Sequence, residues 1–208
     1  MYWFQWLSLF ALFVCLLSCA YHFYMIVRLG NPPEYARRAG HVGRAVRYSF
    51  TGAMSPKVKE SAYLHLPTYI AGIFYHTGTF LSIILFFLSM FNIWVHGWMK
   101  WAIIAFLLVS VFCGMGILIK RMIKNELRSL SNPDDYISNI LVTAFQFITA
   151  LLLFDPVFGP AYYIIASMLL LYFPLGKLKH AVYFFAARYH LGYFYGWRGI
   201  WPPKPIKK

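Results

Sequence analysis

Acidic side chains are scarce in this chain, and charged residues of either sign are few. Only 12% of the 208 residues are charged and 61% are hydrophobic, whereas soluble domains carry about 25% charged residues. The acidic residues all fall outside the long apolar runs: Glu34, Glu60, Glu126, Asp134, Asp135 and Asp155. The runs therefore offer no carboxylate as a base, a metal ligand or a coupling group. This argues against a membrane-embedded hydrolase or lipid enzyme, and against a coupled transporter.

Cysteine is equally rare, and Cys15, Cys19 and Cys113 all lie within apolar runs. Their placement disfavours a disulfide framework or a structural zinc site, and without a Cys-x-x-Cys-His motif any haem should be b-type. Leu16-Leu-Ser-Cys19 resembles a lipoprotein cleavage box, but no positive residue precedes it and the apolar run continues through Val27. We therefore expect a retained helix rather than a signal peptide.

Five apolar runs reach the length of about 20 residues that a membrane-spanning helix needs. They cover residues 3–27, 63–92, 101–119, 137–154 and 160–183. The sequence therefore predicts an all-α integral membrane protein, a bundle of five transmembrane helices forming a single domain over residues 1–208. Prolines near the inner ends of runs two and five, Pro67 and Pro174, are predicted to kink these helices.

The formal net charge of +13 is distributed unevenly between the connecting segments. All Lys and Arg residues except Lys100 fall in the first loop (28–60), the third loop (120–136), or the end of run five and the tail (184–208). This asymmetry predicts an outside amino terminus and a cytoplasmic carboxyl terminus in a cell inner membrane, and it disfavours nucleic acid as the partner. The first loop suits either anionic headgroups or a docking face for a cytoplasmic protein.

Histidines on runs two and five are the strongest functional signal, because lipid cannot hydrogen-bond an imidazole nitrogen. His65 and His76 are separated by about 20° beyond three full helical turns and by roughly 16 Å along the axis. His180 and His190 are roughly 80° and about 15 Å apart. Runs two and five are antiparallel. The axial spacing of the histidines and their depth below the outer helix ends then match when His76 is paired with His180 and His65 with His190. Two imidazoles per iron give a six-coordinate haem suited to electron transfer.

The simpler alternative is that each imidazole is hydrogen-bonded to a neighbouring group. His22, near the inner end of run one, is a spare that either replaces one ligand or bonds a haem propionate. His41 and His96 lie in loops and are expected to be solvated.

Two sequence elements carry a family resemblance: Phe74-Tyr-His76-Thr-Gly78 in run two and Phe173-Pro-Leu-Gly-Lys-Leu-Lys-His180 in run five. With five spans and an outside amino terminus, the chain resembles the gamma subunit of respiratory nitrate reductase. It is also similar to cytochrome b subunits of heterodisulfide-reductase-like, sulfite-reductase-associated and quinone-modifying complexes. The resemblance covers essentially the whole chain, and Pro-x-x-Lys-Leu-x-His is its most specific part.

The resemblance implies that His76 and His180 hold the haem nearer the cytoplasm. Its second, outer pair falls here on Phe86 and Tyr162, which cannot ligate iron. Either the outer haem is absent, or a second haem has moved inward to His65 and His190. One or two haem b groups are therefore expected.

The expected function is electron transfer between membrane menaquinone or ubiquinone and a cytoplasmic iron–sulfur or flavin subunit, within a hetero-oligomeric complex. The chain would be a subunit of an oxidoreductase rather than a stand-alone enzyme, since it has no nucleotide motif or thiolate cluster. The alternative is a haem-free structural membrane subunit of a larger complex. No motif selects a quinone site among the possible members: Tyr69, Tyr75, Tyr162, Tyr163 and His22.

Overall fold

The computed structural model describes residues 2–30, 33–58, 62 and 64–203, and all regular structure in these residues is helical. The long helices are α1 (Trp3–Leu29), α4 (Leu66–Met90), α5 (Gly97–Ile123), α7 (Pro133–Phe154), α8 (Gly159–Tyr172) and α9 (His180–Trp197). Shorter elements are α2 (Val42–Phe50), α6 (Asn125–Ser129), η1 (Gly52–Met54), η2 (Pro56–Val58), η3 (Pro156–Phe158) and η4 (Lys177–Lys179). Glu60 and four lysines of the predicted basic segments, Lys59, Lys204, Lys207 and Lys208, lie outside the described residues.

Four helices, α1, α4, α5 and α7, are long and apolar enough to cross a membrane, and the pair η3–α8 and η4–α9 raises the number to five if it is one broken span. Helical multi-pass character is thus confirmed at this level. The ends of the first four spans shift from the predicted bounds by a few residues.

The fifth span corrects the prediction of one continuous helix over 160–183. Helix α8 ends at Tyr172, and α9 begins only at His180. Pro174 lies in this break, because its missing N–H and its ring are incompatible with an uninterrupted helix. Pro67, in contrast, is the second residue of α4, where the N–H has no helical acceptor, so it produces no kink.

The chain divides into two compact units. Unit 1 comprises Met1–Ser18 and Pro67–Leu178, and unit 2 comprises Cys19–Leu66 and Lys179–Lys208. Helix α1 contributes to both units. The single-domain organisation predicted from the sequence stays a prediction.

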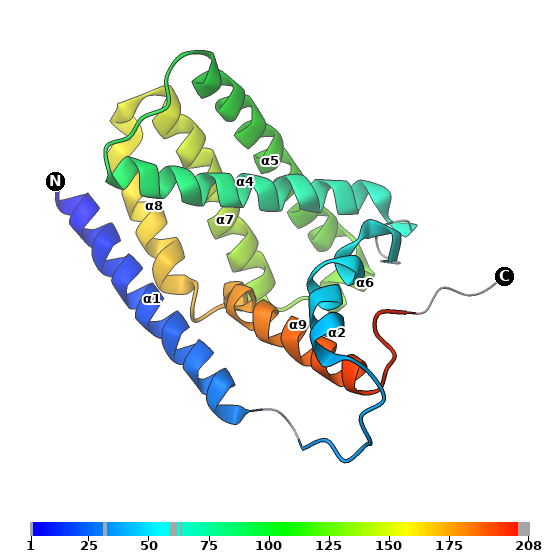
Figure 1. Cartoon of the computed structure of the whole chain (residues 1–208). Coiled ribbons are helices and arrows are strands. Elements are labelled where there is room, and N and C mark those ends of the chain that lie inside the picture. Colours follow the sequence, from blue (N-terminus) through cyan, green and yellow to red (C-terminus); the bar gives the residue numbers. More distant parts are fainter. Residues whose placement is uncertain (1, 31–32, 59–61, 63, 204–208) are drawn as a thin grey trace. The chain divides into compact units, whose positions relative to one another are not determined.

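Unit 1 is built around α7, in which half of the most apolar stretch of 18 residues is buried. Helix α7 lies beside α5 and α8 (Figure 1). Its start is defined by a capping box, in which the Asn132 side chain accepts from the Asp135 N–H and the Asp135 carboxylate accepts from the Asn132 N–H, with Pro133 as the first helical residue. The buried apolar side chains around this helix form one cluster: Phe86, Val142, Phe145, Ile148, Leu152, Tyr162, Tyr163, Ala166 and Leu169.

Unit 2 is centred on the pair α2 and α9, which lie side by side (Figure 1). Small residues allow the close approach, because a Cβ on Gly192 would lie 2.5 Å from the Val46 Cα. The Ser49 hydroxyl also donates to the carbonyl oxygen of Arg188 at 2.7 Å. The two helices are therefore joined at the backbone level.

Candidate functional site

His76 occupies the part of α4 that is not covered by the rest of unit 1. All buried residues of α4 lie after it: Gly78, Ser82, Leu85, Phe86 and Ser89. The His76 side chain is exposed, and its Nδ1 lies 2.9 Å from the Gly72 carbonyl oxygen one turn earlier. Since a carbonyl only accepts, Nδ1 carries the hydrogen, and in the neutral imidazole the lone pair is then on Nε2.

This tautomer is the one that a metal-ligating histidine needs. Metal-bound imidazoles commonly donate their second N–H to a carbonyl or carboxylate, which fixes the ring orientation. Space is also available beside the ring, because a Cβ on Gly72 would meet nothing within 4 Å. The local geometry of His76 therefore fits an axial ligand of haem iron.

The turn of α4 that carries His76 is held by a polar network from α5 and α7. Gln146 Nε2 donates to the Thr79 hydroxyl at 2.7 Å and to the Tyr75 carbonyl oxygen at 3.1 Å. Ser110 Oγ lies 2.6 Å from Gln146 Oε1, to which it can donate, and 3.0 Å from the Phe74 carbonyl oxygen. Both Ser110 and Gln146 are fully buried. The network thus holds α4 at the backbone of Phe74 and Tyr75 before His76 and at the Thr79 side chain after it.

Tyr75 contributes to the same anchoring. Its hydroxyl lies 3.0 Å from the Asn139 carbonyl oxygen and 3.1 Å from Thr143 Oγ1, both on α7. Sequence reasoning listed Tyr75 as a possible quinone contact and missed Ser110 and Gln146 as supports of His76. A glutamine inside an apolar span was the available signal, since polar side chains in membrane helices face other helices.

The two positions at which the resembled family has its outer ligand pair are closed by aromatic packing. The rings of Phe86 and Tyr162 are 6.3 Å apart, and Phe145 stacks on Tyr162 at 5.8 Å. Phe86 is 3% exposed and Tyr162 is fully buried. A macrocycle has no space between them.

Tyr163 is likewise part of the interior of unit 1. Its ring stacks on Phe4 of α1, and the Ser8 hydroxyl donates to its carbonyl oxygen at 2.7 Å. Tyr162 and Tyr163 therefore serve packing in this unit.

His180 is the first residue of α9 and is exposed. The break before it removes the basis of the depth count that matched His180 to His76, because that count assumed an uninterrupted helix from residue 160. The ten-residue spacing to His190 remains within one helix. His76 belongs to unit 1 and His180 to unit 2, so their pairing stays a prediction.

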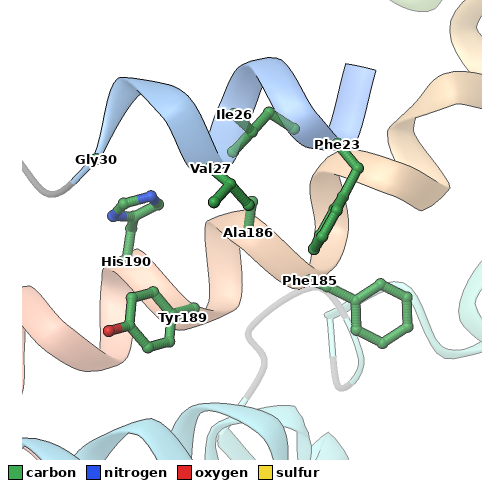
Figure 2. A pocket seen from close by; sticks show the side chains of 8 residues that line it. All are labelled: Phe23, Ile26, Val27, Gly30, Phe185, Ala186, Tyr189 and His190. Atoms are coloured by element: carbon green, nitrogen blue, oxygen red, sulfur yellow. The ribbon is translucent and has the colours of Figure 1, made fainter. Parts of the chain in front are cut away.

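His65 and His190 both belong to unit 2. His65 stands directly before α4, not inside the helix as predicted, and is exposed. His190 is half-buried in α9 and lines a hollow between α9 and the end of α1 (Figure 2). The described residues around this hollow do not include His65. The pairing of these two histidines stays a prediction.

His22, the predicted spare, has a protein partner. Its Nδ1 lies 3.1 Å from the Tyr183 hydroxyl of α9. Across residues 2–30, 33–58, 62 and 64–203, no group of three or more His, Cys, Asp and Glu side chains forms a metal site. Two axial imidazoles need no such cluster.

Part of the basic charge is neutralised locally. Asp135 pairs with Arg121 and Lys177 in unit 1, and Glu34 pairs with Arg198 in unit 2. A backbone N–H from Ala36, together with the Arg198 guanidinium, holds the pKa of Glu34 below its usual value. Arg44 and Arg47 of α2 stay exposed.

Comparisons with protein-family models, curated proteins and solved structures give no match to this chain.

Proposed function

We propose that this chain is a haem b-containing membrane anchor that transfers electrons between a membrane quinone and a cytoplasmic iron–sulfur or flavin subunit. The observation that carries the proposal is the His76 imidazole, which is bonded through Nδ1 to its own helix and exposed with Nε2 available. His180 is the proposed second ligand, and His65 with His190 are the candidates for a second haem. The resemblance to the nitrate reductase gamma subunit and its relatives supports the same assignment.

When bound between two imidazoles, haem b supplies one-electron transfer without an open coordination position. The residues of the chain hold and orient the ligands. The Gly72 carbonyl selects the His76 tautomer, and Gln146 with Ser110 fixes the helix around it.

The proposed orientation places the amino terminus outside and the basic segments in the cytoplasm of a cell inner membrane. The exposed Arg44 and Arg47 would then attract an acidic partner surface and accelerate its docking. The complex is proposed to be hetero-oligomeric, because this chain has no other redox group.

The second candidate is a haem-free structural subunit. It is favoured by helix α1, because only 11% of its most apolar stretch of 18 residues is buried within the chain. This leaves a large apolar surface for lipid or neighbouring subunits.

A dithionite-reduced minus oxidised spectrum with haem quantitation separates the two candidates. We expect a sharp α-band in the purified chain, loss of haem in His76→Ala, and no change in His96→Ala, an exposed loop histidine used as the control. One further haem lost in His65→Ala supports a second site. A wild-type chain without haem overturns the cytochrome proposal and leaves the structural subunit.

A further inference from the structure

Unit 2 contains a hollow of about 420 Å³ between the last turns of α1 and the middle of α9. This volume lies in the range of about 300–1,000 Å³ that is usual for small-molecule sites. Phe23, Ile26 and Val27 line it from α1, and Phe185 and Ala186 line it from α9 (Figure 2). We call this hollow the α1–α9 slot.

Tyr189 and His190 are the polar side chains among the residues that line the slot. Figure 2 shows the His190 ring pointing from α9 toward the end of α1, whereas the neighbouring Tyr189 ring points away. Among the residues that the structure describes, His190 contacts the Tyr189 ring but has no hydrogen-bond partner. An imidazole at the edge of an apolar site is costly unless something bonds it.

A second hollow, of about 470 Å³ between α4 and α5 in unit 1, shows the contrast. Its two most polar side chains, Lys120 and Thr68, hydrogen-bond each other. The donor of the α4–α5 hollow is therefore satisfied within the chain, whereas His190 in the α1–α9 slot has no hydrogen-bond partner among the residues that the structure describes.

We propose that the α1–α9 slot binds the ring headgroup of a membrane quinone, with His190 hydrogen-bonded to one of its carbonyl oxygens. A quinone combines a flat apolar ring with carbonyl acceptors, and both features match this lining. A lipid acyl chain would fill the space and leave the imidazole unpaired. The inference rests on the proposed quinone-linked function. It assigns His190 to the slot in place of the second haem pair with His65, so that the haem at His76 and His180 is the one that all variants should keep.

The test is photolabelling of the full chain in phospholipid vesicles with an azido-naphthoquinone, followed by peptide mapping, competition with menadione, and haem quantitation on the same samples. His190→Phe removes the hydrogen bond, and Ala186→Phe fills the slot while keeping the imidazole. His190→Gln keeps an N–H donor. His41→Phe, at an exposed position of the same unit, is the matched control.

The proposal expects menadione-sensitive label on α9 or on the end of α1. Loss of one hydrogen bond should lower labelling of His190→Phe by about tenfold, and Ala186→Phe should fall at least as far. Labelling of His190→Gln and His41→Phe should stay near that of the wild type, and all variants should keep their haem.

If labelling is unchanged in both Ala186→Phe and His190→Phe, the slot does not bind the quinone, and lipid is then its occupant. Haem loss in His190→Phe overturns it in favour of an axial ligand. A wild-type chain that lacks haem overturns the proposed cytochrome function instead, and the labelling pattern then still decides for or against the slot.

Discussion

The two units are stabilised in different ways, and the difference indicates where a cofactor has room. Unit 1 has a closed interior around α7, in which Gln146, Ser110 and Thr149 are buried and hydrogen-bonded without any charge. In unit 2, α9 buries only two residues, Gly192 and Gly196. The Glu34–Arg198 ion pair joins the loop before α2 to the end of α9. The interior of unit 1 around α7 is therefore filled by protein, and uncovered apolar and histidine-bearing surface lies on unit 2 and around His76 on the first half of α4.

Helix α4 shows the same contrast within 25 residues. Its second half contributes Phe86 to the closed aromatic cluster, whereas its first half presents His76 on an exposed surface. Phe86, where the resembled family has an outer ligand, lies in the closed second half of α4. His76, the proposed inner ligand, lies in the exposed first half. The packing along α4 therefore agrees with the position of its histidine.

The largest effect is expected from replacing the aromatic pair that closes the second half of α4 against α8. Replacing both Phe86→His and Tyr162→His restores the ligand types of an outer pair, but it removes two buried aromatic rings, which should cost about 4 kcal/mol or more of unfolding free energy. We expect no additional haem and a large fall in the thermal midpoint in detergent.

Phe80→His is the control, because Phe80 lies on the same helix and is 63% exposed. Its loss of stability should be much smaller. A second haem in the double variant would show that the aromatic cluster is not closed.

The second prediction concerns the helix contact of unit 2. A Cβ on Gly192 would lie 2.5 Å from the Cα and 3.0 Å from the nitrogen of Val46, and backbone atoms cannot rotate away. Gly192→Ala should therefore push α2 off α9, at a cost of about 3 kcal/mol. Hydrogen exchange of the α2 amides should accelerate. Gly43→Ala, where a Cβ meets nothing within 4 Å, should leave exchange unchanged or slower.

The third prediction compares two glycines of α4. A Cβ on Gly78 would lie 2.1 Å from the Ser110 hydroxyl oxygen and 3.0 Å from Gln146 Oε1, whereas Gly72 has open space. Because side chains can partly adjust, Gly78→Ala should cost about 2 kcal/mol, and Gly72→Ala should be neutral or slightly stabilising. Thermal unfolding of the two variants measures the difference. Equal midpoints would mean that the network around Gln146 is loosely packed.

Hydropathy predicted four spans well, because runs of about 20 apolar residues have few other uses. It failed at residues 173–179, where Pro174 and Gly176 interrupt the helix. The sequence analysis treated Pro174 as a kink within one helix. A kink and a full break share the same sequence signal, and the structure shows the break.

The candidate site was predictable only in part. The histidines stand out by their chemistry, but the bond from His76 to Gly72 depends on the rotamer, which spacing does not determine. Likewise, Phe86 and Tyr162 were recognised as non-ligands, whereas their mutual packing is a tertiary contact between helices far apart in sequence. The slot at His190 has no motif, because α1 and α9 form it together.

The smallest expected effect is a pH response of stability. It distinguishes the Glu34–Arg198 ion pair, the charged tie of unit 2, from the neutral hydrogen-bond network of Gln146 in unit 1. Glu34 accepts from the Ala36 N–H at 3.1 Å and from Arg198 at 2.6 and 3.0 Å, so its pKa in the folded chain is lowered. A lowered folded pKa stabilises the fold above the unfolded value of about 4.3, and this contribution disappears as the pH falls through the folded value.

The thermal midpoint of the wild type should therefore exceed that of Glu34→Gln slightly at pH 6, and the gap should close as the pH falls below the ordinary glutamate value. The gap is small because the pair is solvent-accessible. Gln146→Leu provides the reference, since removing a neutral buried amide should lower the midpoint by an amount that does not change over the same pH range. A gap of zero at every pH would leave the tie to the backbone hydrogen bond between the Ala39 N–H and the Trp197 carbonyl oxygen rather than to charge, and this tie would then be neutral like the Gln146 network of unit 1.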